Sequence, residues 1–102
     1  MTDRAALDIT DAASIEAGLD RLKPWAVINT AGFVRTWEAA EKVDECFKAN
    51  ATGAEMLARG CKLHSLPLVT FSSDLVFDGQ LGRSYVEPDT PAPACEYGRS
   101  KA

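Results

Sequence analysis

Apolar residues in this chain gather in three short runs separated by two longer stretches of mixed character. The runs are Ala5–Ile9, Trp25–Asn29 and Leu66–Phe71. Each is short enough for a buried strand and is bounded by turn or capping residues. We therefore predict a strand at each of the three positions.

The stretch between the first two runs has the pattern of an amphipathic helix. Asp11 is a favourable N-cap, and Lys23-Pro24 stops the helix, because the residue before a proline disfavours the helical conformation. Between them the apolar residues recur at helical spacing, at Ala12, Ile15, Leu19 and Leu22. The pattern predicts a helix from about residue 12 to residue 22.

The stretch between the second and third runs predicts a longer helix. Its apolar stripe consists of Val43, Phe47, Ala51, Ala54 and Ala58. Gly60 follows as a natural C-cap. Strands that alternate with helices and are themselves almost wholly apolar are typical of a parallel sheet. We therefore predict an α/β fold with a parallel sheet of about three strands and flanking helices.

The last part of the chain differs in character from the rest. Residues 78–94 contain an Asp-Gly turn signal and three prolines, so they are predicted to form a long surface loop. Loops of that length in a compact domain are more often functional than not. A new helix is expected to begin near Cys95.

Composition and charge exclude several classes of protein. The 102 residues amount to one domain at most, and 46% hydrophobic with 25% charged residues is typical of a globular protein. A net charge of −4 without a basic cluster argues against a nucleic-acid partner. Apolar runs of about six residues are far short of the roughly 20 that cross a bilayer. The N-terminus also lacks the pattern of a signal peptide, so no membrane partner is expected.

The cysteines point to a reducing compartment. Cys46, Cys61 and Cys95 are odd in number and form no C-x-x-C pair, so we expect no disulfide framework and a cytoplasmic location. Cys61 and His64 have the spacing of two zinc ligands. However, His64 is the one histidine of the chain and no second pair completes a tetrahedral site, so no metal is predicted.

Tyr97 and Lys101 are the first candidates for chemistry. Four residues apart on a helix, they share one face at a separation of about 6 Å, where a phenol and an ammonium can act as a pair. A surface helix with an exposed lysine would have the same spacing. Taken alone, this motif therefore leaves both interpretations open.

Polar and small residues follow each predicted strand. In open parallel sheets, ligands bind outside the carboxyl ends of the strands, so these residues face the expected site. They are Asp8-Ile9, Asn29-Thr30-Ala31-Gly32 and Phe71-Ser72-Ser73-Asp74. Asn50 lies close to the apolar stripe of the second helix, where its amide must be satisfied by a neighbour, a water or a ligand. Each segment alone is also compatible with an ordinary turn.

Taken together and in order, these segments resemble the extended short-chain dehydrogenase/reductases, and within them the dTDP-4-dehydrorhamnose reductase group. The resemblance covers nearly the whole chain. It implies a Rossmann-like three-layer fold, NADP or NAD as cofactor and a nucleotide sugar as substrate. The matching stretches are Leu7–Asp11, Val27–Phe33, Asn50–Gly53, Phe71–Gly79 and Tyr97–Lys101.

The resemblance also implies roles for individual residues. Tyr97 matches the tyrosine that exchanges a proton with the sugar carbonyl oxygen. Lys101 matches the lysine that assists the tyrosine and hydrogen-bonds the nicotinamide ribose, and Ser73 matches the hydroxyl that holds the carbonyl oxygen. The cofactor-binding set comprises Tyr97 and Lys101, together with Asp8 and Ile9 beside the adenine and the turn Ala31, Gly32 and Phe33.

Two parts that this family usually has are not recognised in the sequence. No G-x-G-x-x-G turn is present, so residues 1–102 are expected to be a single partial NAD(P)-binding domain that lacks the N-terminal Gly-rich βα unit and the C-terminal substrate domain. We therefore predict an inactive fragment of a 4-keto-sugar reductase. The alternative is a non-catalytic binding or regulatory subunit with the same fold. In either case, exposed strand edges favour a homo-oligomer.

Overall fold

Two short strands lie side by side and run in the same direction. The computed structural model describes residues 3–102. Strand β1 (Val27–Asn29) pairs in parallel with strand β2 (Leu68–Thr70), in the register that sets Ile28 opposite Val69. Because the strands are parallel, their carboxyl ends meet at one edge of the sheet. The predicted α/β fold with a parallel sheet is confirmed.

Helix α1 (Ala12–Leu22) has the predicted bounds and caps. The carboxylate of Asp11 accepts a hydrogen bond from the backbone N–H of Ala13 at 3.0 Å. At the other end Lys23 adopts a left-handed conformation, with φ of 44°, and its N–H donates to the carbonyl of Leu19. Local capping and the following proline therefore set the two ends of this helix.

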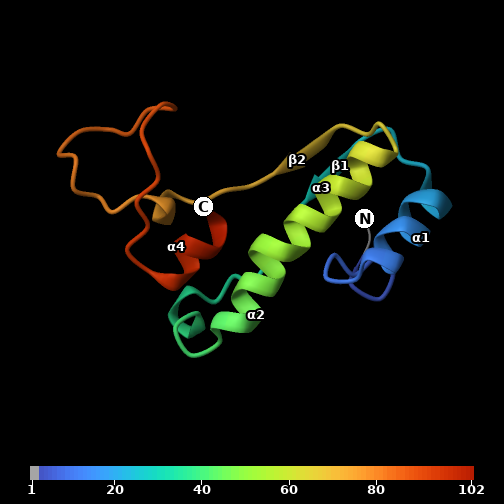
Figure 1. Ribbon diagram of the computed structural model, residues 1–102, viewed down its shortest axis with the longest axis horizontal. Coiled ribbons are helices and arrows are strands. Elements are labelled where there is room, and N and C mark those ends of the chain that lie inside the picture. Colours follow the sequence, from blue (N-terminus) through green and yellow to red (C-terminus); the bar gives the residue numbers. More distant parts are fainter. Residues whose placement is uncertain (1–2) are drawn as a thin grey trace.

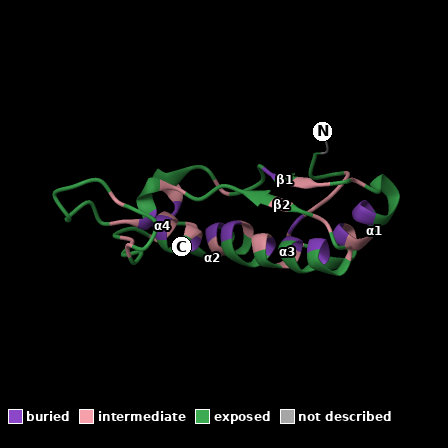
Figure 2. Ribbon diagram, turned by 90° about the horizontal axis from the view of Figure 1, so that it is seen from above, coloured by how far each residue is buried: buried purple, intermediate pink, exposed green. Residues whose placement is uncertain are grey.

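A single long helix follows β1 and precedes β2 in the sequence, and it crosses the molecule on one side of the two strands (Figure 1 and Figure 2). It consists of α2 (Val43–Phe47), a π-helical turn at Lys48–Thr52 and α3 (Gly53–Leu63), and a short 3-10 turn (Thr36–Glu38) precedes it. Figure 1 shows this helix running diagonally beneath the sheet, with α1 at one end and α4 (Glu96–Lys101) at the other. The long helix therefore connects the two ends of the molecule.

The buried core lies between α1 and α3. Its buried members are Ile9, Ile15, Leu19, Leu57 and Cys61. The inward side chains of the two strands pack against this cluster from above. Figure 2 shows the long helix on one side of the strands, while no helix of residues 3–102 covers their other side. The bare side exposes Ile28 and Val69, which are 65% and 51% exposed. Residues 3–102 therefore form one sheet layer and one helix layer, which are two of the three layers expected of a Rossmann-like fold (Figure 2).

The predicted strand at Ala5–Ile9 is wrong, and the described residues contain two strands rather than about three. The segment forms turns instead. The backbone carbonyl of Asp3 accepts hydrogen bonds from the N–H groups of Ala6 and Leu7 at 3.1 and 3.0 Å. A strand needs a neighbour for its N–H groups, and here Asp3 supplies the acceptors locally. The apolar pattern of the segment nevertheless reports burial correctly, because Ile9 is only 8% exposed.

Gly60 does not end the second helix as predicted. It lies inside α3, which continues to Leu63 and is capped at His64. A Cβ atom at Gly60 would lie only 2.8 Å from Cγ2 of Ile15 on α1. The glycine therefore allows two helices to approach closely, a requirement that the local sequence does not reveal.

The loop predicted at residues 78–94 is confirmed, and it projects from the body of the molecule beside α4 (Figure 1). The rings of Phe77 and Tyr85 stack at 4.0 Å between centroids. The guanidinium of Arg83 donates to both carboxylate oxygens of Asp89, at 2.7 and 2.8 Å. Side-chain contacts within the loop thus replace the regular backbone pairing that it lacks. The helix expected near Cys95 is also confirmed as α4.

Candidate active site

The turn after β1 is shaped by the side chain of Asn29. This asparagine is 7% exposed, and its Oδ1 accepts a hydrogen bond from the backbone N–H of Ala31 at 3.0 Å. Its amide nitrogen donates to the hydroxyl of Thr70 on β2 at 3.4 Å. Asn29 thus ties the ends of the two strands together and brings the small residues of the turn to the carboxyl edge of the sheet.

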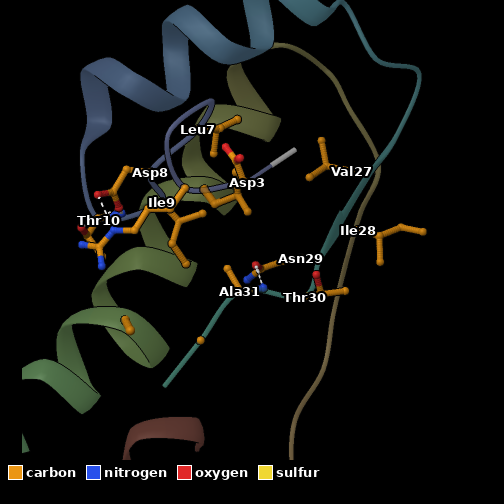
Figure 3. A pocket seen from close by; sticks show the side chains of 14 residues that line it. Asp3, Leu7, Asp8, Ile9, Thr10, Val27, Ile28, Asn29, Thr30 and Ala31 are labelled. Carbon is orange, nitrogen blue, oxygen red and sulfur yellow. Dashed lines mark hydrogen bonds and ion pairs between the residues drawn. The ribbon is translucent and has the colours of Figure 1, made fainter. Parts of the chain in front are cut away.

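A first pocket, of about 410 Å³, lies between β1 and the N-terminal turns (Figure 3). We call it the N-terminal pocket. It is lined by Asp8 and Ile9 on one side and by Ala31 and Gly32 on the other. The structure thereby brings together four residues that the resemblance assigned to cofactor binding, although Asp8 and Ile9 stand at the start of a turn and not at the end of a strand.

Asp8 is held as a carboxylate in this pocket. Its Oδ1 accepts hydrogen bonds from the backbone N–H of Thr10 at 2.9 Å and from the Thr10 hydroxyl at 2.8 Å. Arg4 donates to the other oxygen at 2.9 Å. These donors, the Thr10 backbone first, lower the pKa of Asp8 to about 2. At neutral pH the side chain can therefore only accept hydrogen bonds.

A second pocket, of about 200 Å³, lies between the same turn and helix α4, and we call it the tyrosine pocket. Tyr97 and Lys101 line it from one side, and Ala31, Gly32 and Phe33 line it from the other. Residues 31 and 32 also line the N-terminal pocket, so the two pockets adjoin along one turn. The phenol, the ammonium and the turn assigned to the cofactor thus surround one space.

Ser73 does not line the tyrosine pocket. It is the N-cap of the short 3-10 helix η3 (Asp74–Val76), where its hydroxyl accepts from the N–H of Leu75 at 3.2 Å and donates to Asp74 at 3.1 Å. Ser72, one residue earlier, lines the pocket instead. The catalytic role of Ser73 remains a prediction.

Asn50 lines the tyrosine pocket, and neighbouring residues satisfy its amide, which is one of the three possibilities that its position in the apolar stripe allowed. Its Oδ1 accepts from the backbone N–H of Phe33 at 2.8 Å, and its amide nitrogen donates to the carbonyl of Phe33 at 3.2 Å. The same nitrogen donates to the hydroxyl of Ser100 on α4 at 3.0 Å. Gly32 is required beside it, because a Cβ there would lie 2.7 Å from Asn50 Oδ1.

Three further residues lie around the hydrogen bonds of Asn50, and the sequence pattern did not single them out as site residues. They are Cys46, Gly98 and Ser100. Cys46 and Ser100 are 0% and 3% exposed, and the Cys46 thiol donates to the Ser100 hydroxyl at 3.2 Å. The two residues are 54 positions apart, so no local pattern joins them. The one available signal was the i,i+4 spacing of Cys46 and Asn50, which places both on one side of a helix.

Cys61 and His64 do not converge on a common point. Cys61 belongs to the core, whereas the imidazole Nε2 of His64 lies 2.9 Å from Glu16 on α1. In residues 3–102 no group of three or more metal-ligating side chains is gathered. Within the same residues no helix has both the length and the apolar character to cross a membrane.

Comparison with known proteins identifies relatives over the whole chain. Residues 1–102 match the family described as RmlD substrate binding domain. A dTDP-4-keto-6-deoxy-D-glucose reductase of Streptomyces niveus is 40% identical over 98 residues, which are 96% of this chain and 34% of that protein. A dTDP-4-dehydrorhamnose reductase of Aggregatibacter actinomycetemcomitans is 34% identical over 98% of this chain and 34% of its own length.

A solved structure supports the same relationship. The crystal structure of dTDP-4-dehydrorhamnose reductase from Bacillus anthracis str. Ames in complex with NADP superposes with a TM-score of 0.94 at 32% identity. The superposition covers 98% of this chain and 36% of the chain from Bacillus anthracis. The chain therefore spans about a third of the length of the relatives it matches, and over that span it belongs to the RmlD substrate binding domain family.

Proposed function

We propose that this chain is the central part of an NAD(P)-dependent reductase that acts on a nucleotide-linked 4-keto sugar. The observation that carries the proposal is the tyrosine pocket, in which Tyr97 and Lys101 face the turn Ala31–Phe33 across one space. The names of the similar reductases and the NADP complex of a structural relative support it.

The chain's own residues would perform the proton chemistry. Tyr97 would donate its phenolic proton to the sugar carbonyl oxygen as the carbonyl is reduced. Lys101, one helical turn away, would stabilise the phenolate that remains and hydrogen-bond the ribose of the cofactor. We propose that the Ser73 hydroxyl donates to the carbonyl oxygen and holds it, which requires its proton to leave the Asp74 carboxylate to which it now donates. The bound nicotinamide cofactor supplies the hydride.

The residues present fit two portions of a dinucleotide. The turn at Ala31–Gly32 has small side chains next to both pockets, which allows a ligand to approach the backbone closely. Arg4, Arg35 and Lys48 line a further pocket of about 420 Å³ beside the same turn, together with the carboxylate of Glu45. Arg4 pairs with Asp8 and Arg35 pairs with Glu38, so the charge around this pocket is mixed.

The described residues fit the pyrophosphate of a dinucleotide less well than they fit its other portions. The two glycines with positive φ, Gly79 and Gly82, stand in the projecting loop with no atom near their Cβ positions. They form no cradle at a helix N-terminus. We therefore propose that residues 1–102 form a partial cofactor-binding domain, and that the Gly-rich βα unit and the substrate domain belong to other parts of such a reductase.

Two experiments test these proposals. Calorimetry of the 102-residue chain with NADPH is expected to show no binding in the sub-millimolar range and no turnover, and tight binding would contradict the partial-domain proposal. In a reductase of family length that carries this chain, Tyr97→Phe is expected to abolish NADPH-dependent reduction. Biological activity retained by that variant would instead favour a non-catalytic binding or regulatory role.

The expected compartment of such a reductase is the cytoplasm. The three cysteines are free thiols in the structure, and Cys46 takes part as a thiol in a buried hydrogen-bond network. Free thiols are typical of proteins in a reducing environment. Fractionation of the source cells, with detection by an antibody against this chain, would test the location.

A further inference from the structure

Helix α4 (Glu96–Lys101) packs against the long helix and against η3 (Asp74–Val76). These contacts hold the direction in which Tyr97 and Lys101 point. On a helical wheel, Gly98 and Ser100 flank the face that carries Tyr97 and Lys101, one on each side, and both are buried.

On one flank, Gly98 rests against the backbone carbonyl of Leu75 in η3. That contact limits how closely the helix approaches η3. Because glycine has no side chain, no side-chain hydrogen bond fixes the helix on this flank. On the other flank, Ser100 meets Cys46 and Asn50 of the long helix. This second flank contains directional bonds, so it can fix the rotation of α4 about its own axis.

The donors and acceptors of this network fit one another, and Nδ2 of Asn50 also lies 3.7 Å from the Cys46 sulfur. The N–H of Phe33 needs an acceptor, so Oδ1 of Asn50 faces it at 2.8 Å and the amide nitrogen faces Ser100. The Ser100 oxygen accepts from Asn50 at 3.0 Å and from the Cys46 thiol at 3.2 Å. The single proton of Ser100 then goes to the backbone carbonyl of Tyr97, at 2.7 Å. The Ser100 hydroxyl thus fills its one donor and two acceptor positions.

The network joins two residues that line the tyrosine pocket. Phe33 and Tyr97 both line it, and Asn50 and Ser100 are the links between their backbones. Cys46, Asn50 and Ser100 are all buried, so water does not compete for these bonds. Asn50 stands in the π-helical turn Lys48–Thr52, a local departure from α-helix that is frequent at functional sites.

We propose that Ser100 and Cys46 are positioning residues that set the direction of Tyr97 and Lys101 by coupling helix α4, through Asn50, to the turn at Phe33. The proposal rests on the proposed function for its consequence in catalysis. Its physical content, a coupling between Phe33 and Tyr97 through Ser100, can be measured without any enzymatic activity.

The test uses nuclear magnetic resonance on the 102-residue chain with Ser100→Ala. The substitution removes the acceptor of one Asn50 N–H, so the Asn50 side chain loosens and the Phe33 amide is expected to exchange with solvent about tenfold faster. The Tyr97 ring signals are expected to shift, while those of Tyr85, the other tyrosine, serve as an unmoved internal reference. Arg99→Ala, on the exposed side of the same helix, is the matched control and should change neither.

A purely local role for Ser100 predicts a different result. If its hydroxyl only satisfies the Tyr97 carbonyl within α4, Phe33 exchange in Ser100→Ala stays within about twofold of the wild type, and the proposal is overturned. If Ser100→Ala fails to fold, Cys46→Ser decides the matter. This variant keeps a donor to Ser100, so it should preserve Phe33 protection, whereas Cys46→Ala should reduce it. Equal protection in the two Cys46 variants would overturn the proposal.

A kinetic arm separates this proposal from the function on which it rests. In a reductase of family length that carries this chain, Ser100→Ala is expected to lower kcat about tenfold and change KM for NADPH by less than about twofold, because proton donation is misaligned while binding is retained. An unchanged kcat would overturn the positioning role. A wild-type protein without reductase activity would refute the proposed function, whereas the amide-exchange result would still decide the coupling.

Discussion

Gly98 of helix α4 lies directly against the backbone carbonyl of Leu75, with no room between them for a side chain. The helix that carries Tyr97 and Lys101 therefore approaches η3 as closely as its backbone permits. Pro93, from the end of the projecting loop, is the next neighbour of the same position, at 3.0 Å from the Cβ that Gly98 lacks. A glycine inside a six-residue helix is thus required by packing, although it disfavours the helix itself.

Gly98→Ala is expected to displace α4 and to destabilise the protein by about 1–3 kcal/mol, because the gain in helix propensity is smaller than the cost of the clash with rigid backbone. Chemical denaturation measures the loss, and the Tyr97 ring signals report the displacement. Arg99→Ala on the exposed side of α4 is the control. A Gly98→Ala variant as stable as the parent would show that α4 can move away from Leu75 without loss.

The contact between Gly60 and Ile15 makes a second prediction, at the other end of the molecule. Gly60→Ala would place a methyl group 2.8 Å from Cγ2 of Ile15, which is 1% exposed and cannot easily move. We expect destabilisation by about 1–3 kcal/mol, measured by thermal unfolding. In a double-mutant cycle, Ile15→Ala should make room for the new methyl, so the double variant should be more stable than the sum of the single effects predicts. Strict additivity would contradict a direct clash.

The Asp8 carboxylate makes a prediction about pH. Its pKa is about 2 in the folded protein against an ordinary value of 3.8, so its contribution to stability is present above about pH 4 and is lost as the pH falls towards 2. Thr10→Val removes the hydroxyl donor but keeps the backbone N–H, which is the larger cause. We therefore expect the Asp8 pKa to rise only part of the way towards 3.8.

The titration of the Asp8 carboxyl carbon by nuclear magnetic resonance measures this shift. Asp78 is an internal control, because the N–H of Gln80 and the hydroxyl of Tyr85 lower its pKa in a separate loop. Its titration should be the same in Thr10→Val and in the parent chain. An Asp8 pKa that does not change would mean that the Thr10 hydroxyl contributes nothing to the carboxylate.

The bare side of the sheet predicts self-association. Ile28 and Val69 are exposed opposite each other on the two strands, and Phe71 follows at 57% exposed. Contiguous apolar surface of this kind favours association in water. We expect multi-angle light scattering of the 102-residue chain to show dimers or larger species, and Ile28→Thr to lower the average mass.

The control for that experiment is Leu63→Thr, which removes an even more exposed apolar side chain, 78% exposed. Leu63 ends helix α3, and this helix lies on the other side of the sheet from the bare side (Figure 2). It should leave the mass unchanged. A monomer that persists at high concentration in the parent chain would contradict the prediction of a homo-oligomer.

The sequence by itself determined the features that depend on near neighbours. Helix α1 begins at the Asp11 cap and ends before Lys23-Pro24, and the projecting loop coincides with its turn and proline signals. The parallel order of the strands also followed from the alternation of apolar runs and helical stripes. These features rest on backbone preferences and on bonds between residues a few positions apart, which a sequence pattern records directly.

Only the tertiary structure decided which residues share a space. It placed Gly60 within a helix contact and brought Ser72 rather than Ser73 to the tyrosine pocket. It also joined Cys46 and Asn50 to Ser100, 54 and 50 positions away along the chain. The physical reason is the same in each case. A buried polar group or a missing Cβ is explained by its partner, and these partners come from other elements of the fold.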